Sequence, residues 1–175
     1  KGCRVFVASH PLELPGDAMT MITEDTRLAL ALLSVRLYRD PSKELHVVGI
    51  TGTKGKTTSA LMAAHILNRC GIAAGYIGSN GVEYGGQHFD TLNTTPESCD
   101  IQRYLRDMVN AGMRVCVMEV ASQALKLSRV HCVRFDTCVF TNLSPDHISA
   151  YEHPDFAPTE DQLKLIDEQE KYYGN

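Results

Sequence analysis

Residues 46–58 read H-V-V-G-I-T-G-T-K-G-K-T-T, an apolar run followed by a glycine-rich turn. Val47 and Ile50 belong to an apolar, β-branched run that predicts a buried strand of a parallel sheet. From residue 56 to residue 70 the apolar side chains follow helical spacing, and Gly71 ends the predicted helix. A strand, a glycine turn and the start of a helix therefore follow one another, which is the order that holds a phosphate chain.

The turn, G-T-K-G-K-T-T, carries the residue types that bind phosphates. Gly52 and Gly55 allow a tight bend that points backbone N–H groups at phosphate oxygens. Lys56 is expected to reach the β- and γ-phosphates, and the Thr57 hydroxyl to contact a magnesium ion. The predicted nucleotide site has seven members: Gly52, Thr53, Lys54, Gly55, Lys56, Thr57 and Thr58. The alternative is a glycine turn with a helix-capping lysine, since Ile50 stands where the common P-loop has glycine.

Composition limits the possible partners. The 175 residues suffice for one α/β domain, with or without a remnant of another, and a hydrophobic fraction of 43% can fill a core. The net charge of −4 and the lack of a basic block argue against a nucleic-acid partner. No apolar run approaches membrane-spanning length, so we expect no membrane partner. The chain begins at Lys1, partway into an expected folded unit, and we therefore expect a fragment.

The six cysteines contain no C-x-x-C pair. Two of them, Cys116 and Cys138, lie inside strand-like runs, where a reduced thiol behaves as a small apolar side chain. We therefore expect reduced thiols in a cytoplasmic protein and no zinc site.

Alternating strands and helices surround the turn. Before the turn, we expect strands at 4–9 and 19–22 and a helix from 24 to about 38 that is capped by Thr23. After the helix that follows the turn, we expect a strand at 73–79, a hairpin or loop at 80–92 and a helix that begins with Thr95 as its N-cap and ends at Gly112. A strand at 114–120, a turn or short helix at 121–127 and a strand at 136–143 follow, and residues 158–175 form, at best, a short amphipathic helix. This order predicts an α/β fold with a parallel sheet flanked by helices.

Ionisable residues follow two of the predicted strands. Glu119 ends an apolar strand, where a carboxylate needs a metal ion or a lysine nearby, and we predict it to be a magnesium ligand. His147 follows the strand at 136–143 and is predicted to be a second metal ligand. Arg129 lies near the same edge, and its residue type alone does not distinguish a ligand contact from a surface charge.

Four motifs occur together: G-T-K-G-K-T-T at Gly52, N-T-T-P-E-S at Asn93, M-E-V-A-S-Q-A-L at Met118 and F-T-N-L-S-P-D-H-I at Phe140. In this order and spacing they resemble the Mur ligases, most closely the tripeptide-forming MurE type. The resemblance implies an end of an N-terminal, UDP-binding-type domain at 1–42, a central ATP-binding domain at 43–157 and a charged tail at 158–175. It implies no C-terminal domain in this chain.

The resemblance also implies an activity. Enzymes of this type use ATP and Mg2+ to convert the γ-carboxylate of UDP-N-acetylmuramoyl-L-alanyl-D-glutamate to an acyl phosphate, which the amine of a diamino acid then attacks. Carried onto this sequence, Lys56, Glu119 and His147 are catalytic, and Thr57, Glu119 and His147 hold magnesium. A monomer is expected. The implied substrate contacts come from five residues: Asn93, Thr94, Thr95, Ser122 and Arg129.

Two alternatives stay open from the sequence. A folylpolyglutamate or cyanophycin-type ligase shares the turn and the amide-forming chemistry. A nucleotide-binding module without catalysis is the other, because the carbamylated lysine of the family has only a displaced counterpart in Lys164, beside Leu163 at the expected position. One residue of displacement turns a helical side chain by about 100°.

Overall fold

The computed structural model describes residues 3–14 and 16–144 of the chain. The predictions for His147, for Lys164 and for the tail at 158–175 lie outside these residues. The described residues up to Asn142 belong to one compact unit.

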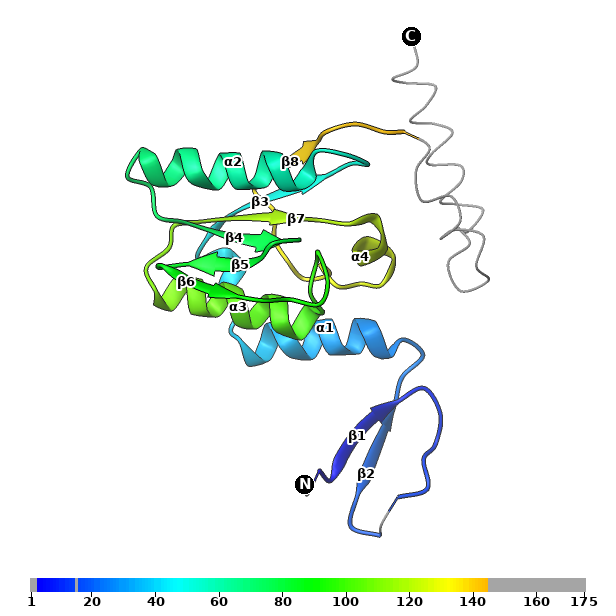
Figure 1. The fold of residues 1–175 in the computed structure, drawn as a ribbon. Coiled ribbons are helices and arrows are strands. Elements are labelled where there is room, and N and C mark those ends of the chain that lie inside the picture. Colours follow the sequence, from blue (N-terminus) through cyan, green and yellow to red (C-terminus); the bar gives the residue numbers. More distant parts are fainter. Residues whose placement is uncertain (1–2, 15, 145–175) are drawn as a thin grey trace. The chain divides into compact units, whose positions relative to one another are not determined.

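A six-stranded sheet in the order β6-β5-β4-β7-β3-β8 forms the centre of the unit (Figure 1). Its four parallel strands confirm the predicted fold class, and β5 and β6 form a hairpin, the first of the two alternatives expected at 80–92. The strands span β3 His46–Thr51, β4 Ala74–Gly78, β5 Gly81–Tyr84, β6 Gln87–Phe89, β7 Val115–Glu119 and β8 Thr137–Phe140.

The parallel register brings the carboxyl ends of the central strands to one edge of the sheet. Ile50 on β3 pairs with Glu119 on β7, so the carboxyl ends of these two central strands coincide. The chain after β3 enters the glycine turn at this same edge. Ligands of open α/β sheets bind at the carboxyl ends of the strands.

Helices cover both faces of the sheet (Figure 1). On one face, α2 Lys56–Arg69 packs Ala60 and Ala64 against Tyr76 and Val117, and these small helical residues let the helix approach the strands closely. On the other face, α3 Ser98–Asn110 buries an apolar stripe, and α1 Thr26–Leu37 packs against α3. The stripe consists of Ile101, Tyr104, Leu105 and Met108.

Shorter elements complete the described residues. A parallel pair, β1 Val5–Ala8 and β2 Met19–Ile22, matches the two predicted N-terminal strands. The 3-10 helix η1 Pro41–Lys43 follows α1, and α4 Ser122–Lys126 lies where a turn or a short helix was expected after β7. Within the described part of the chain, every helix is too short or too polar to cross a lipid bilayer.

Two predicted helix caps are wrong. α1 is capped by Asp25, whose Oδ1 accepts from the N–H groups of Arg27 and Leu28 at 2.9 Å each, and Thr23 does not cap it. α3 begins at Ser98, with Glu97 rather than Thr95 at its N-cap position. Asp and Thr side chains can both accept hydrogen bonds from the first N–H groups of a helix. The sequence around α1 was therefore compatible with either Thr23 or Asp25 as the N-cap residue.

Candidate functional site

The turn between β3 and α2 has the backbone of a phosphate-binding loop. Gly52 and Gly55 have φ angles of 126° and 84°, which favour glycine. Lys56 and Thr57 are the first two residues of α2, and their backbone N–H groups make no hydrogen bond within the described residues. Lys56 Nζ donates to the carbonyl oxygens of Gly52 at 2.7 Å and Thr53 at 3.1 Å, so its ammonium group lies within the turn. Free N–H groups, a helix N-terminus and an ammonium together suit a polyphosphate.

Two residues after β8 hold this turn in place. The Asn142 side chain donates to the Lys54 carbonyl at 2.9 Å and accepts from the Lys54 N–H at 3.0 Å. The Thr141 hydroxyl donates to the same carbonyl at 2.7 Å. A Cβ at Gly52 would overlap the Thr141 side chain, so the close packing of the turn against Thr141 requires glycine at position 52. Thr141 and Asn142 come from the F-T-N-L motif and were not predicted to support the turn.

Glu119 is fully buried at the end of β7 and is surrounded by donors. Thr57 Oγ1 donates to Oε2 at 2.8 Å, and Tyr76 Oη donates to Oε1 at 2.6 Å. The Ser79 N–H adds a bond to Oε1 at 2.9 Å. A buried carboxylate is tolerated when such donors compensate its charge, and these come from α2, β4 and the residue that follows β4.

The pair Thr57 and Glu119 suits magnesium. Adjacent ligands in an octahedral site with bonds of about 2.0–2.1 Å lie about 2.9 Å apart. The separation of 2.8 Å between Thr57 Oγ1 and Glu119 Oε2 matches this edge. In the described ranges no three His, Cys, Asp or Glu side chains gather to hold a metal ion. Thr58, the last predicted member of the nucleotide site, is exposed on α2.

The predicted substrate segment lies beside this carboxylate. Thr95 is buried, donates to the Glu119 carbonyl at 2.9 Å and accepts from the Ala121 N–H at 3.0 Å. The hydroxyls of Thr94 and Ser79 are 3.0 Å apart. Asn93 is exposed next to them, and Ser122 is exposed at the start of α4. The segment is thus attached to Glu119 both directly and through Ser79.

Arg129 reaches the same segment from the chain after α4. Its guanidinium pairs with Glu97 at 2.8 Å and donates to the Thr95 carbonyl at 3.1 Å. The Nε atom is buried and has no hydrogen-bond partner among the described residues. Glu97 also pairs with Arg27 of α1 at 3.3 Å. Arg129 therefore supports the segment that carries Thr94 and Thr95.

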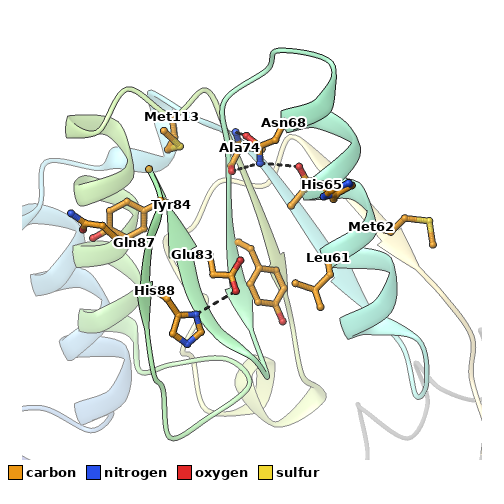
Figure 2. A pocket seen from close by; sticks show the side chains of 14 residues that line it. Leu61, Met62, His65, Asn68, Ala74, Glu83, Tyr84, Gln87, His88 and Met113 are labelled. Atoms are coloured by element: carbon orange, nitrogen blue, oxygen red, sulfur yellow. Dashed lines mark hydrogen bonds and ion pairs between the residues drawn. The ribbon is translucent and has the colours of Figure 1, made fainter.

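A groove of about 780 Å3 lies between α2 and the strands β4–β6 (Figure 2). Its lining includes His65 and Asn68 of α2 and a Glu83–His88 pair from β5 and β6 at 3.3 Å. None of the residues predicted for the nucleotide or the substrate lines it, but its lining includes Tyr76, whose hydroxyl contacts Glu119. The groove and the constellation around Glu119 therefore share this one side chain.

The parallel sheet, the glycine turn and the buried carboxylate together define a P-loop-containing α/β domain. The family model described as the Mur ligase middle domain matches residues 50–166. The chain belongs to the Mur ligase family, and the match assigns most of it to the middle domain.

Curated relatives agree with this family. A UDP-N-acetylmuramoyl-L-alanyl-D-glutamate--2,6-diaminopimelate ligase of Clostridium perfringens is 38% identical over 152 residues, which cover 87% of this chain and 31% of that protein. The ligase of the same name from Chlorobium phaeobacteroides is 43% identical over 149 residues, or 85% and 29% of the two chains. A UDP-N-acetylmuramyl-tripeptide synthetase of Bifidobacterium longum is 40% identical over 157 residues, or 89% and 30%. The chain thus spans less than a third of these relatives.

A solved structure supports the fold. A UDP-N-acetylmuramoyl-L-alanyl-D-glutamate--2,6-diaminopimelate ligase superposes with a TM-score of 0.70 at 21% identity, covering 92% of this chain and 31% of that one.

Proposed function

We propose that the chain carries the nucleotide site of an ATP-dependent amide ligase of the MurE type. The ligase would join a diamino acid to UDP-N-acetylmuramoyl-L-alanyl-D-glutamate, and the names of the similar ligases support this substrate pair. We also propose the domain division at 1–42, 43–157 and 158–175, a monomeric state and a cytoplasmic location.

The observation that carries the proposal is the 2.8 Å contact between Thr57 Oγ1 and Glu119 Oε2. Thr57 follows Lys56 in the turn, and Glu119 is a buried carboxylate on β7, the strand beside β3. The distance between their oxygens is the one that adjacent magnesium ligands adopt. A glycine turn alone could hold many anions, whereas this pair adds a cation site beside the phosphates.

The residues of the chain then have distinct tasks. The turn N–H groups and Lys56 bind the phosphates of ATP and offset negative charge as the γ-phosphoryl group is transferred. Thr57 and Glu119 would hold Mg2+, which would supply further neutralisation of the phosphate charge. This division fits phosphoryl transfer, which depends on positioning and charge more than on covalent catalysis.

The acceptor substrate is proposed to lie against the segment after β6. Thr94 contacts Ser79, which in turn contacts Glu119, and Asn93 and Ser122 are exposed close to Thr94 and Glu119 in sequence. The substrate carboxylate is proposed to bind against these side chains. Attack of the carboxylate on that phosphorus gives an acyl phosphate and ADP, and the amine of the diamino acid then displaces phosphate. Arg129 contributes by holding this segment through Thr95 and Glu97.

Calorimetry tests the proposal on the 175-residue chain. Mg-ADP is expected to bind the wild-type chain and the control Lys43→Ala, whose altered lysine is exposed and pairs with Asp40. It is expected to fail with Lys56→Ala. In the presence of Mg-ADP, UDP-N-acetylmuramoyl-L-alanyl-D-glutamate should bind and a folate should not. Substrate-dependent release of phosphate from ATP, lost in Lys56→Ala, would support catalysis.

The other outcomes are equally clear. Selective binding of the folate would replace the proposal with a folylpolyglutamate-type ligase. Binding of Mg-ADP with neither second ligand would favour a nucleotide-binding module for this chain. Equal binding of Mg-ADP by Lys56→Ala and wild type would contradict the site.

A further inference from the structure

Tyr76 is a buried residue for which no role was predicted from the sequence. It lies on β4 with an exposed fraction of 1%, and its ring packs in the cluster beneath α2. Its hydroxyl donates to Glu119 Oε1 at 2.6 Å, across the pairing of β4 with β7. A Cβ at Gly78 would overlap both this oxygen and the Tyr76 hydroxyl, so the approach of the two side chains depends on glycine there.

The two oxygens of Glu119 have different surroundings. Oε1 accepts from the Tyr76 hydroxyl and from the Ser79 N–H at 2.9 Å. Oε2 has the Thr57 hydroxyl at 2.8 Å and the Ser79 hydroxyl at the longer distance of 3.5 Å. The donors to Oε1 are a backbone amide and the phenol hydroxyl of a buried side chain, whereas the closest donor to Oε2 is the threonine hydroxyl of Thr57.

We propose that Tyr76 is a positioning residue for the magnesium site: with the Ser79 amide it holds Oε1 of Glu119, so that Oε2 alone faces the cation. This inference rests on the proposed function, because it assumes that Thr57 and Glu119 hold the magnesium of a bound nucleotide. It assigns Tyr76 no contact with nucleotide or substrate.

The packing of Tyr76 makes it suitable for this task. The ring is packed among buried side chains, so the direction of the O–H group is set by the core rather than by solvent. Outer partners that orient a metal-binding carboxylate typically contribute about 10- to 100-fold to metal affinity.

Tyr76→Phe tests the inference because it removes the donor and keeps the ring. The affinity of Mn2+ for the chain with ADP bound, measured by electron paramagnetic resonance, should fall about 10-fold. The affinity for ADP in EDTA, measured by calorimetry, should stay at the wild-type value. Tyr84→Phe is the matched control, because Tyr84 is also buried on a strand but its ring stacks on Phe89 away from Glu119. Circular dichroism checks that each variant is folded.

The outcomes separate the inference from the proposed function. Wild-type chain that binds no Mn2+ in the presence of ADP would overturn the proposed function, and the inference with it. Wild-type binding with an unchanged Mn2+ affinity in Tyr76→Phe would overturn the inference alone. Equal losses of metal-free ADP affinity and Mn2+ affinity would show a general structural role, and so would the same loss in Tyr84→Phe.

Discussion

The hydroxyl of Thr95 donates to the backbone carbonyl of Glu119 at 2.9 Å, which fixes the segment before α3 to the end of β7. The same oxygen accepts from the Ala121 N–H at 3.0 Å. One buried side chain thus satisfies two backbone groups at the point where the chain leaves the sheet. The T-T-P-E and M-E-V motifs, separated in sequence, form one structural unit through this residue.

Replacing Thr95 by valine should destabilise the fold. Valine keeps the shape but leaves a buried carbonyl and a buried N–H without their partner, at a cost of about 1–3 kcal/mol. The free energy of unfolding in urea measures this loss. Thr94→Val is the control and should change it by about 0.5 kcal/mol or less, because the Thr94 hydroxyl meets Ser79 at a partly exposed site. Equal losses in the two variants would contradict the role of Thr95.

Gly78→Ala should damage stability and metal binding together. The added methyl group would overlap Glu119 Oε1 and the Tyr76 hydroxyl, and forced packing of this kind costs about 1–3 kcal/mol. Thermal unfolding and the Mn2+ titration described above measure both effects. Gly16→Ala is the control because nothing lies within 4 Å of its added Cβ. A stable Gly78→Ala chain with wild-type metal affinity would show that the carboxylate has room to move.

Local patterns in the sequence predicted much of the fold. The apolar run at β3, the glycines at 52 and 55 and the helical spacing of α2 each act over a few residues, and the structure follows them. The strand that carries Glu119 and the parallel sheet were also predicted, because a strand–helix alternation restricts the topology, whereas the pairing of this strand with β3 comes from the structure.

Several contacts between distant residues were not predicted. Tyr76 looks like any aromatic residue of a buried strand, and its bond to Glu119 spans 43 positions. Asn142 joins Lys54 across 88 positions. Thr95 shows the converse error: its sequence context suits an N-cap, but the tertiary partners at the end of β7 outcompete the local one.

The ion pair between Arg129 and Glu97 should couple more strongly than the pair between Arg27 and Glu97. Arg129 has an exposed side-chain fraction of 14% against 48% for Arg27, so water screens the first pair less. Double-mutant cycles with alanine, read from the free energy of unfolding, should give more than about 1 kcal/mol for Arg129 and less for Arg27. In 1 M salt the Arg27 coupling should vanish first, because the screening length falls to about 3 Å. A larger coupling for Arg27 would contradict this assignment.

Cys116 should react with alkylating reagents more slowly than the exposed cysteines of the folded chain. It is fully buried in β7, and desolvation raises its pKa to about 12, so only about one thiol in ten thousand is ionised at pH 8. The thiolate is the reactive form, and a raised pKa therefore lowers the rate of alkylation at any pH below 12. Iodoacetamide at pH 8, followed by peptide mass spectrometry, should label the exposed Cys70 first and Cys116 only after unfolding in guanidinium. Labelling of Cys116 at the rate of Cys70 in the folded chain would mean that β7 is accessible to solvent, which would also remove the basis for a buried Glu119 at its end.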